Sequence, residues 1–352
     1  MSTKTQPGNY FEDFSLGQTL VHATPRTVGP GEVAMYTALY GNRFALSSAD
    51  PFAVSMGLPQ APLESMLAFH LVFGKTVPDI SLNAIANLGY ANGRFAQPVY
   101  PGDTLSSRST VIGLRQNKDG KSGVVYVHTV GMNQHHQTVL EYVRWVMVRK
   151  RDPAAPAPEP VVPTLPSAVA VTDLHVPFQV DPAHYDHALA GSPYCWEDYT
   201  VGERIDHVDG MTIEESEHML ATRLYQNTAK VHFNQHIERE GRFGRRIVYG
   251  GHIISLARSL SFNGLANAQA IVAINGGRHT NPSFAGDTIY AWSEVLEQIE
   301  LPGRSDVGAL RLRTIATKDR TCADFPAQDA NGVYDLAVVL DFDYTVIMPR
   351  RG

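Results

Sequence analysis

The chain has 352 residues, of which 43% are hydrophobic and 18% are charged, and its formal net charge at pH 7 is −6. This composition is typical of one large or two medium-sized globular domains, and the negative charge without a Lys/Arg cluster argues against a nucleic-acid binder. No apolar run reaches the ~20 residues of a membrane span, the polar N-terminus lacks a signal-peptide core, and two cysteines give no disulfide framework, so we expect a cytoplasmic protein.

Two stretches of the chain recur in the same order. Residues 10–42 align without gaps with residues 195–227, at an offset of 185. Residues 94–105 align with residues 278–289 at an offset of 184, and Arg, Pro and the triplet Gly-Asp-Thr recur at the same places. Two ordered matches indicate a tandem duplication of a whole domain, because a short-period repeat protein would show many shorter matches.

A segment rich in proline and alanine, residues 152–168, lies between the two copies. Proline offers no N–H group to a sheet, so this segment is expected to be an extended, semi-rigid connector. The predicted organisation is a first domain over residues 1–151, a linker over 152–180 and a second domain over 181–352.

Each copy has the same predicted order of elements. An acidic-started helix is followed by a loop and then by an apolar helix; these helices span 30–39 and 65–73 in the first copy, and 212–224 and 251–262 in the second. Gly74 and Asn263-Gly264 are expected to end the apolar helices. Strands dominate the remainder, at 104–114, 123–133, 138–149, 288–299, 309–317 and 336–348. The pattern predicts an α+β fold in which an antiparallel sheet curls around each apolar helix.

The second copy carries groups suited to proton transfer. Asn227 can hold a water molecule, His232 can move a proton near neutral pH, and the Gly250-Gly251 doublet lets a carbonyl oxygen approach the positive end of a helix. A surface or packing role is the alternative for His232. The spacing of His232 and His236 could suit a metal on a helix, but no third ligand follows at a convincing spacing, so no metal site is expected.

This arrangement resembles the MaoC-like hydratases. The resemblance rests on the loop with Asn and His, the glycine-started helix and the Arg-x-x-x-Pro-x-x-x-Gly-Asp-Thr element of both copies, and it covers nearly the whole chain outside the linker. It implies a tandem double hotdog fold, in which each half is a bent antiparallel sheet wrapped around a central helix. It also implies reversible hydration of an enoyl-CoA thioester without a cofactor. Residues 23–26 and 37–51 further resemble members whose substrate is branched and bears a second carboxylate.

The family motif Asp-x-Asn-Pro-x-His is altered in this chain. His232 takes the His position, Asn227 takes the Asp position, and Tyr249-Gly250 stands where His-Gly or Gln-Gly is usual. The resemblance therefore implies Asn227, His232 and Gly250 as catalytic residues. His232 is then the main proton-transfer group, because an amide cannot take a proton. Ser47 falls at the His232 position of the first copy, which implies that this half is catalytically inactive and completes the wall of the binding tunnel.

Five residues are candidates for substrate binding. Gly251 and Tyr249 flank the helix start, and Arg278 suits a phosphate or carboxylate, although a structural salt bridge is as plausible. Glu64 lies before the first apolar helix, close to the position matched by Gly251, and is either a helix-terminal acid or a base. Arg43 belongs to a set of arginines that could bind a substrate carboxylate, with Arg223, Arg245 and Arg246.

Three other functions remain open from the sequence. Glu64 is compatible with a hotdog thioesterase, a hydratase for plain acyl chains needs no second carboxylate, and the altered motifs allow a non-catalytic acyl-CoA binder. The expected partner is an acyl-CoA, with no nucleic acid and no membrane, and a homo-oligomer is possible because exposed sheet edges favour association.

Overall fold

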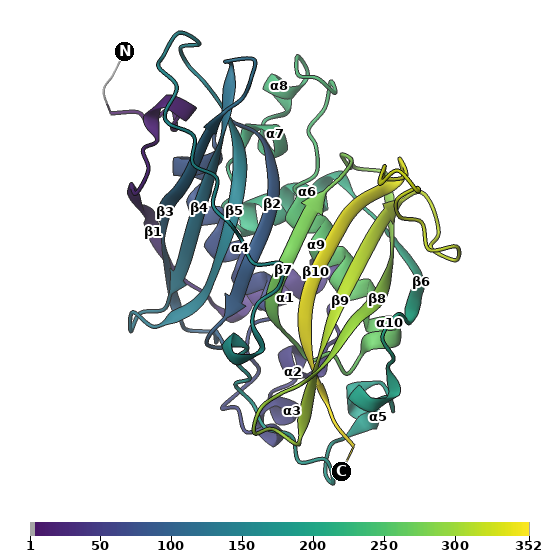
Figure 1. The fold of residues 1–352 in the computed structure, drawn as a ribbon. Helices are drawn as coiled ribbons and strands as arrows, with labels where there is room; N and C mark the ends of the chain where they lie inside the picture. Colours follow the sequence, from purple (N-terminus) through teal and green to yellow (C-terminus); the bar gives the residue numbers. More distant parts are fainter. Residues whose placement is uncertain (1–3, 352) are drawn as a thin grey trace.

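The computed structural model describes residues 4–351 and contains one continuous ten-stranded antiparallel sheet built from two five-stranded halves (Figure 1). The strand order is β1-β3-β4-β5-β2-β7-β10-β9-β8-β6. The first half contains β1 (Thr19–Thr27), β2 (Ala84–Phe95), β3 (Thr104–Gln116), β4 (Ser122–Met132) and β5 (Thr138–Arg149). The second contains β6 (Arg204–Thr212), β7 (Ala270–His279), β8 (Thr288–Glu300), β9 (Val307–Lys318) and β10 (Val338–Pro349). The predicted tandem double hotdog is confirmed.

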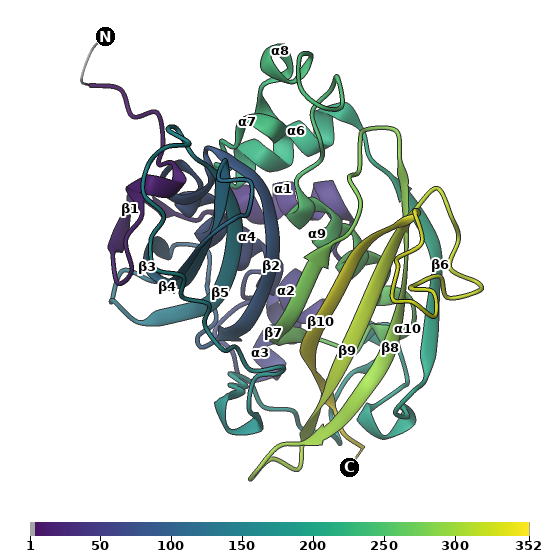
Figure 2. The same cartoon turned by 45° about the horizontal axis from the view of Figure 1, so that its top comes forward.

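One long apolar helix lies against each half of the sheet, and Figure 2 shows both helices behind the strands. They are α4 (Ser65–Thr76) and α9 (Gly250–Leu260), and nearly all of their residues are buried. Burial of this extent suits helices that are apolar over most of their surface, although α9 also buries the polar residues His252, Ser255 and Arg258. The other helices are α1 (Pro30–Tyr40), α2 (Ala45–Ser48), α3 (Asp50–Ser55), α5 (His187–Ala190), α6 (Glu215–Leu224), α7 (Lys230–Phe233), α8 (Gln235–Glu238) and α10 (Phe262–Leu265).

The two halves meet where β2 pairs with β7. Tyr90 faces Gly277, and Gly93 faces Ile274 in this antiparallel register. A Cβ atom on Gly93 would lie 2.8 Å from the Cβ of Ile274, so only glycine allows the two strands this approach. We call this β2–β7 pairing the seam. A single hydrophobic core contains residues of both halves, including Leu67 of α4 and Ile254 of α9. The halves therefore share both a sheet and a core.

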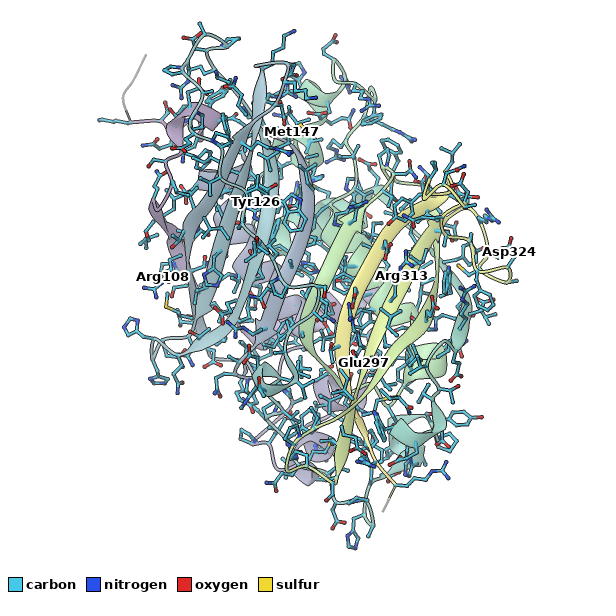
Figure 3. The ribbon with its side chains drawn as sticks, in the orientation of Figure 1. Arg108, Tyr126, Met147, Glu297, Arg313 and Asp324 are labelled. Carbon is cyan, nitrogen blue, oxygen red and sulfur yellow. The ribbon has the colours of Figure 1, made fainter. Side chains whose placement is uncertain are left out.

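The segment after β5 crosses the outer face of the sheet before the second half begins. Val161 forms a bridge with Leu114 of β3, and the N–H group of Val169 donates to Asn275 Oδ1 at 3.0 Å on β7. Figure 3 shows this outer face, with Tyr126 and Met147 on the first half and Glu297 and Arg313 on the second. The linker thus contacts both halves of the sheet on its way between them.

The repeated Gly-Asp-Thr element forms the same turn in both halves. The N–H of Tyr100 donates to Asp103 Oδ2 at 2.8 Å, and the N–H of Phe284 donates to Asp287 Oδ2 at 2.9 Å. The prediction that Gly74 ends its helix is wrong, because α4 continues to Thr76. A Cβ atom at Gly74 would overlap the backbone oxygen of Tyr225, so this glycine serves close helix packing. None of the helices within residues 4–351 has the length and apolar character needed to span a membrane.

Candidate active site

The loop between α6 and α7 is held by Asn227. The Asn227 side chain is 2% exposed, and its Oδ1 accepts a hydrogen bond from the N–H of Ala229 at 3.2 Å. The N–H of Asn227 donates to the carbonyl oxygen of Thr222 at 2.9 Å, which ties the loop to the last turn of α6. Gln226 takes a left-handed conformation, with φ of 55°, so that the chain can reverse here. These contacts fix the direction in which α7 begins.

His232 on α7 is positioned as a neutral base. Its Nδ1 lies 2.9 Å from the carbonyl oxygen of Ile247, and since a carbonyl can only accept, Nδ1 carries the proton. The lone pair of Nε2 is therefore free to accept a proton. Burial lowers the pKa of His232 to about 4, so the ring is uncharged at neutral pH. Its ring lies 5.7 Å from that of Tyr249, which precedes α9.

The start of α9 offers backbone N–H groups without a side-chain cap. Tyr249 occupies the N-cap position, but its hydroxyl lies 3.3 Å from Nδ1 of His70 and does not cap the helix. The first N–H groups of a helix have no partner within it. A Cβ atom at Gly250 would overlap the His279 ring, and one at Gly251 would lie 2.6 Å from His70 Cε1. The absence of a side chain at both glycines therefore lets these rings pack close to the helix start. The unpaired N–H groups and the positive end of the helix dipole are the features that suit an oxyanion.

The matching helix start in the first half is already occupied by a carboxylate. Glu64 is the N-cap of α4, as Tyr249 is of α9, so the structure matches Glu64 with Tyr249 and not with Gly251. Glu64 Oε2 accepts from the N–H of Met66 at 2.6 Å and from the Tyr36 hydroxyl at 3.1 Å. Its Oε1 lies 3.5 Å from Nε of Arg258. Glu64 therefore fills the anion position of its own helix.

The rest of the first-half loop also differs from its counterpart. Asn42 Nδ2 donates to Ser47 Oγ at 3.1 Å, and Asn42 Oδ1 is buried without a partner, so this loop offers no imidazole for proton transfer. A pocket lies beside Ser47 and Glu64, and Phe178 of the linker is among the residues that line it. The first half thus keeps a hollow at the matching place but not the groups for proton transfer.

The structure does not bring Arg43 or Arg278 together with His232. Arg43 is exposed, and its guanidinium lies 4.5 Å from the ring centre of Phe262, beyond the far end of α9 from Gly250. Arg278 is exposed on β7, opposite Asp341 of β10, whereas the next residue, His279, reaches Gly250. Successive residues of a strand point to opposite faces, so Arg278 lies on the outer side of the sheet.

Three further histidines near the site had no catalytic role predicted from the sequence. His218 on α6 is 1% exposed, and neither of its ring nitrogens makes a hydrogen bond, although Nε2 lies 3.5 Å from Oε2 of Glu215. His252 on α9 lies 2.9 Å from the Tyr40 hydroxyl through Nδ1, and His279 Nε2 lies 3.4 Å from the Tyr90 hydroxyl. A comparison of the two copies in the sequence could have identified these histidines. The matching residues of the first copy have no imidazole: they are Val33, Leu67 and Phe95.

The chain is similar to known proteins over its whole length. The model of the MaoC like domain matches residues 13–132. The chain is 75% identical to Beta-methylmalyl-CoA dehydratase of Chloroflexus aurantiacus over 352 residues, with all of both chains covered. It is 61% identical to Mesaconyl-CoA hydratase of Cereibacter sphaeroides, with 99% of this chain and 100% of that protein covered. The double-hotdog protein RV0216 of Mycobacterium tuberculosis superposes with a TM-score of 0.76 at 25% identity, over 98% of this chain and 99% of that one.

Proposed function

Because the chain belongs to the MaoC-like dehydratase family, we propose that it reversibly adds water to the double bond of an enoyl-CoA thioester. The proposed pair of compounds is mesaconyl-CoA and β-methylmalyl-CoA, the substrates in the names of the two relatives that are 75% and 61% identical. One observation supports this function most directly. The second half alone combines an uncapped helix start with a neutral histidine whose Nε2 is free.

In the proposed reaction, the thioester carbonyl oxygen binds the N–H groups at the start of α9. These donors stabilise the negative charge that develops on that oxygen when a nucleophile attacks the conjugated double bond. His232 Nε2 takes one proton from a water molecule, and the water oxygen bonds to the β-carbon. The α-carbon of the resulting enolate then receives a proton from His232. The reverse sequence removes water.

Asn227 contributes to the proposed reaction by position and not by proton transfer. An amide has no proton that it can give up and no basic site at neutral pH, so the proton must move through His232. The contact of Asn227 Oδ1 with the N–H of Ala229 fixes the loop that carries the imidazole. The net reaction adds or removes one water molecule, because the proton that His232 takes is returned to the α-carbon, and no redox cofactor is needed.

The proposed function is tested by incubating the purified protein with mesaconyl-CoA and following the absorbance of the conjugated thioester. We expect this absorbance to fall as water adds, and a product with the mass of the substrate plus water to accumulate. A thiol-reactive dye in a parallel reaction reports free CoA. Release of CoA without loss of the double bond contradicts the hydratase and supports a thioesterase. Glu64 does not favour that second reaction, because its carboxylate is engaged by Met66, Tyr36 and Arg258.

A further inference from the structure

A buried arginine in the first half has no counter-charge. Arg144 on β5 is 0% exposed. Its Nη2 donates to Thr76 Oγ1 at 2.8 Å and to Ser81 Oγ at 3.4 Å, whereas Nε and Nη1 have no hydrogen-bond partner. Among residues 4–351, no aspartate or glutamate forms an ion pair with it, although its guanidinium does lie 4.3 Å from the ring centre of Phe73. Two hydroxyl groups and one aromatic face cannot neutralise a buried guanidinium.

Other arginines of this protein have a carboxylate partner. Arg258 is also buried and lies 3.5 Å from the carboxylate of Glu64. Arg311 and Arg313 are paired with Asp343 and Asp341, each at 2.6 Å. Buried charges are ordinarily paired, because removing an ion from water without a partner costs several kcal/mol. Arg144 therefore lacks an anion that the described residues do not supply.

The surroundings of Arg144 connect it to the candidate active site. Tyr90 on β2 is its direct cross-strand neighbour, and the Tyr90 hydroxyl lies 3.4 Å from Nε2 of His279, the ring beside Gly250. On the other side, the ring of Phe73 lies 5.6 Å from that of Tyr249, the residue before Gly250. Two side-chain routes, through Tyr90 and through Phe73, thus join Arg144 to the start of α9.

We infer that Arg144 binds the second carboxylate of the substrate, the group at the end of the acyl chain opposite the thioester. This inference rests on the proposed function for the identity of the ligand. The free Nε and Nη1 groups can donate to carboxylate oxygens, and arginine is the side chain best suited to that partner. The first half thereby contributes a specificity-determining residue to a reaction whose proton-transfer group lies in the second half.

Binding of two unreactive thioesters tests this role without requiring turnover. Succinyl-CoA and butyryl-CoA have four-carbon acyl groups without a double bond, and they differ at the chain end, which is a carboxylate in the first and a methyl group in the second. We expect wild-type protein to prefer succinyl-CoA in calorimetric titrations. Arg144→Met should weaken succinyl-CoA binding by about 10²-fold, since losing one partner of a buried charge pair is worth at least tenfold in affinity and commonly far more. Binding of butyryl-CoA should change little.

Two further variants make the outcome unambiguous. Arg144→Lys keeps the charge with fewer donors and should retain part of the preference for succinyl-CoA. Arg258→Met removes another buried arginine, one that already has a protein partner, and should leave the ratio of the two affinities unchanged. Circular dichroism and thermal melting confirm that each variant is folded.

The inference is overturned if Arg144→Met lowers both affinities equally, or lowers neither, because Arg144 would then only support the end of α4 through Thr76. This result is separate from a failure of the proposed function. A wild-type protein that does not hydrate mesaconyl-CoA, but prefers succinyl-CoA through Arg144, disproves the reaction and leaves the carboxylate site in place.

Discussion

The chemistry available to this protein depends on the environment of one side chain, His232. Its Nδ1–H is held by the carbonyl of Ile247, which leaves Nε2 as the base. For His232→Ala we expect kcat on mesaconyl-CoA to fall by about 10²–10⁴-fold, the usual contribution of general acid–base catalysis. The fold should be retained, as judged by circular dichroism. Ser47→Ala, the matched change in the first half, should leave kcat almost unchanged. Near-normal turnover by a folded His232→Ala variant would contradict the catalytic role and indicate that this histidine only packs in the fold.

The pH dependence of activity offers a second test at the same residue. Only the neutral form of His232 can accept a proton, and its pKa in the folded protein is about 4, below the ordinary value of 6.5. We therefore expect kcat/KM to hold as the pH is lowered through 6.5 and to decline only as it approaches about 4. Intrinsic fluorescence at each pH separates this decline from unfolding. A decline centred near pH 6.5 in folded protein would contradict the buried, neutral state of the ring.

The sequence predicts part of this site and misses the remainder for a physical reason. Asn227, His232 and Gly250 lie within one stretch of the second copy, so their order and residue types can be read directly. Arg144 and Tyr90 reach the site through strand pairing and helix packing in the other half of the molecule. Nothing in the linear sequence indicates that β2 will lie beside β7, so a residue on β5 cannot be assigned to the site before the sheet is known.

At the level of elements, the two buried helices differ most at the N-cap residue that precedes each of them. Glu64 caps α4 and pairs with Arg258, whereas Tyr249 leaves the start of α9 open. Glu64→Gln should lower the free energy of unfolding, by up to the roughly 3–5 kcal/mol that breaking a buried pair costs. It should change kcat little, because Glu64 has no part in the proposed chemistry. Chemical denaturation and steady-state kinetics measure the two effects, and a large loss of kcat with normal stability would assign Glu64 to catalysis.

A substitution at the start of α9 tests whether its N–H groups bind the thioester. Gly250→Ala places a methyl group against the His279 ring and displaces the donors that receive the thioester oxygen. Loss of one oxyanion donor costs about 10²–10³-fold in kcat, and we expect a decrease of that size with the fold intact. Gly31→Ala is the matched control, since a Cβ atom there meets nothing within 4 Å. Equal activity of the two variants would show that the carbonyl binds elsewhere.

Strands and helices were predictable where apolar side chains follow a regular spacing, and less predictable where glycines interrupt that spacing. Strand 138–149 coincides with β5, and 65–73 lies within α4. Strands β2 and β7 were not predicted, because their glycines interrupt the apolar pattern. Those glycines are the residues that allow the seam to close, as Gly93 does against Ile274. The glycines that make β2 and β7 difficult to predict are therefore the same residues that allow the two halves to join.

For the whole molecule, the buried histidines predict a loss of stability in mild acid. Burial lowers the pKa of His70 and His252 to about 3, and those of His207, His232 and His279 to about 4. In the unfolded chain each takes up a proton near pH 6.5, which the folded protein excludes. Stability is therefore full above about pH 6.5 and falls as the pH drops from there towards 4.

This dependence can be measured by urea denaturation at a series of pH values. The slope should exceed the value for a single group, about 1.4 kcal/mol per pH unit, because several histidines act together. His207→Gln should make the slope shallower, and since His207 lies away from the proposed proton transfer, activity provides an independent check of folding. A free energy of unfolding that is constant between pH 6.5 and 4 would contradict the burial of these rings as neutral groups.

The seam between β2 and β7 has a consequence for how this molecule can change over generations. In a dimer of identical chains, every substitution appears in both subunits, so a residue that improves one site is imposed on the other. Here the two sides of the seam are encoded separately. Ser47 and His232, Glu64 and Tyr249, and Ser255 and His70 are matched positions that hold different residues. A substitution in one half therefore leaves the other half unchanged. Mutations in the first half could alter the preferred acyl group without changing the proton-transfer loop of the second half.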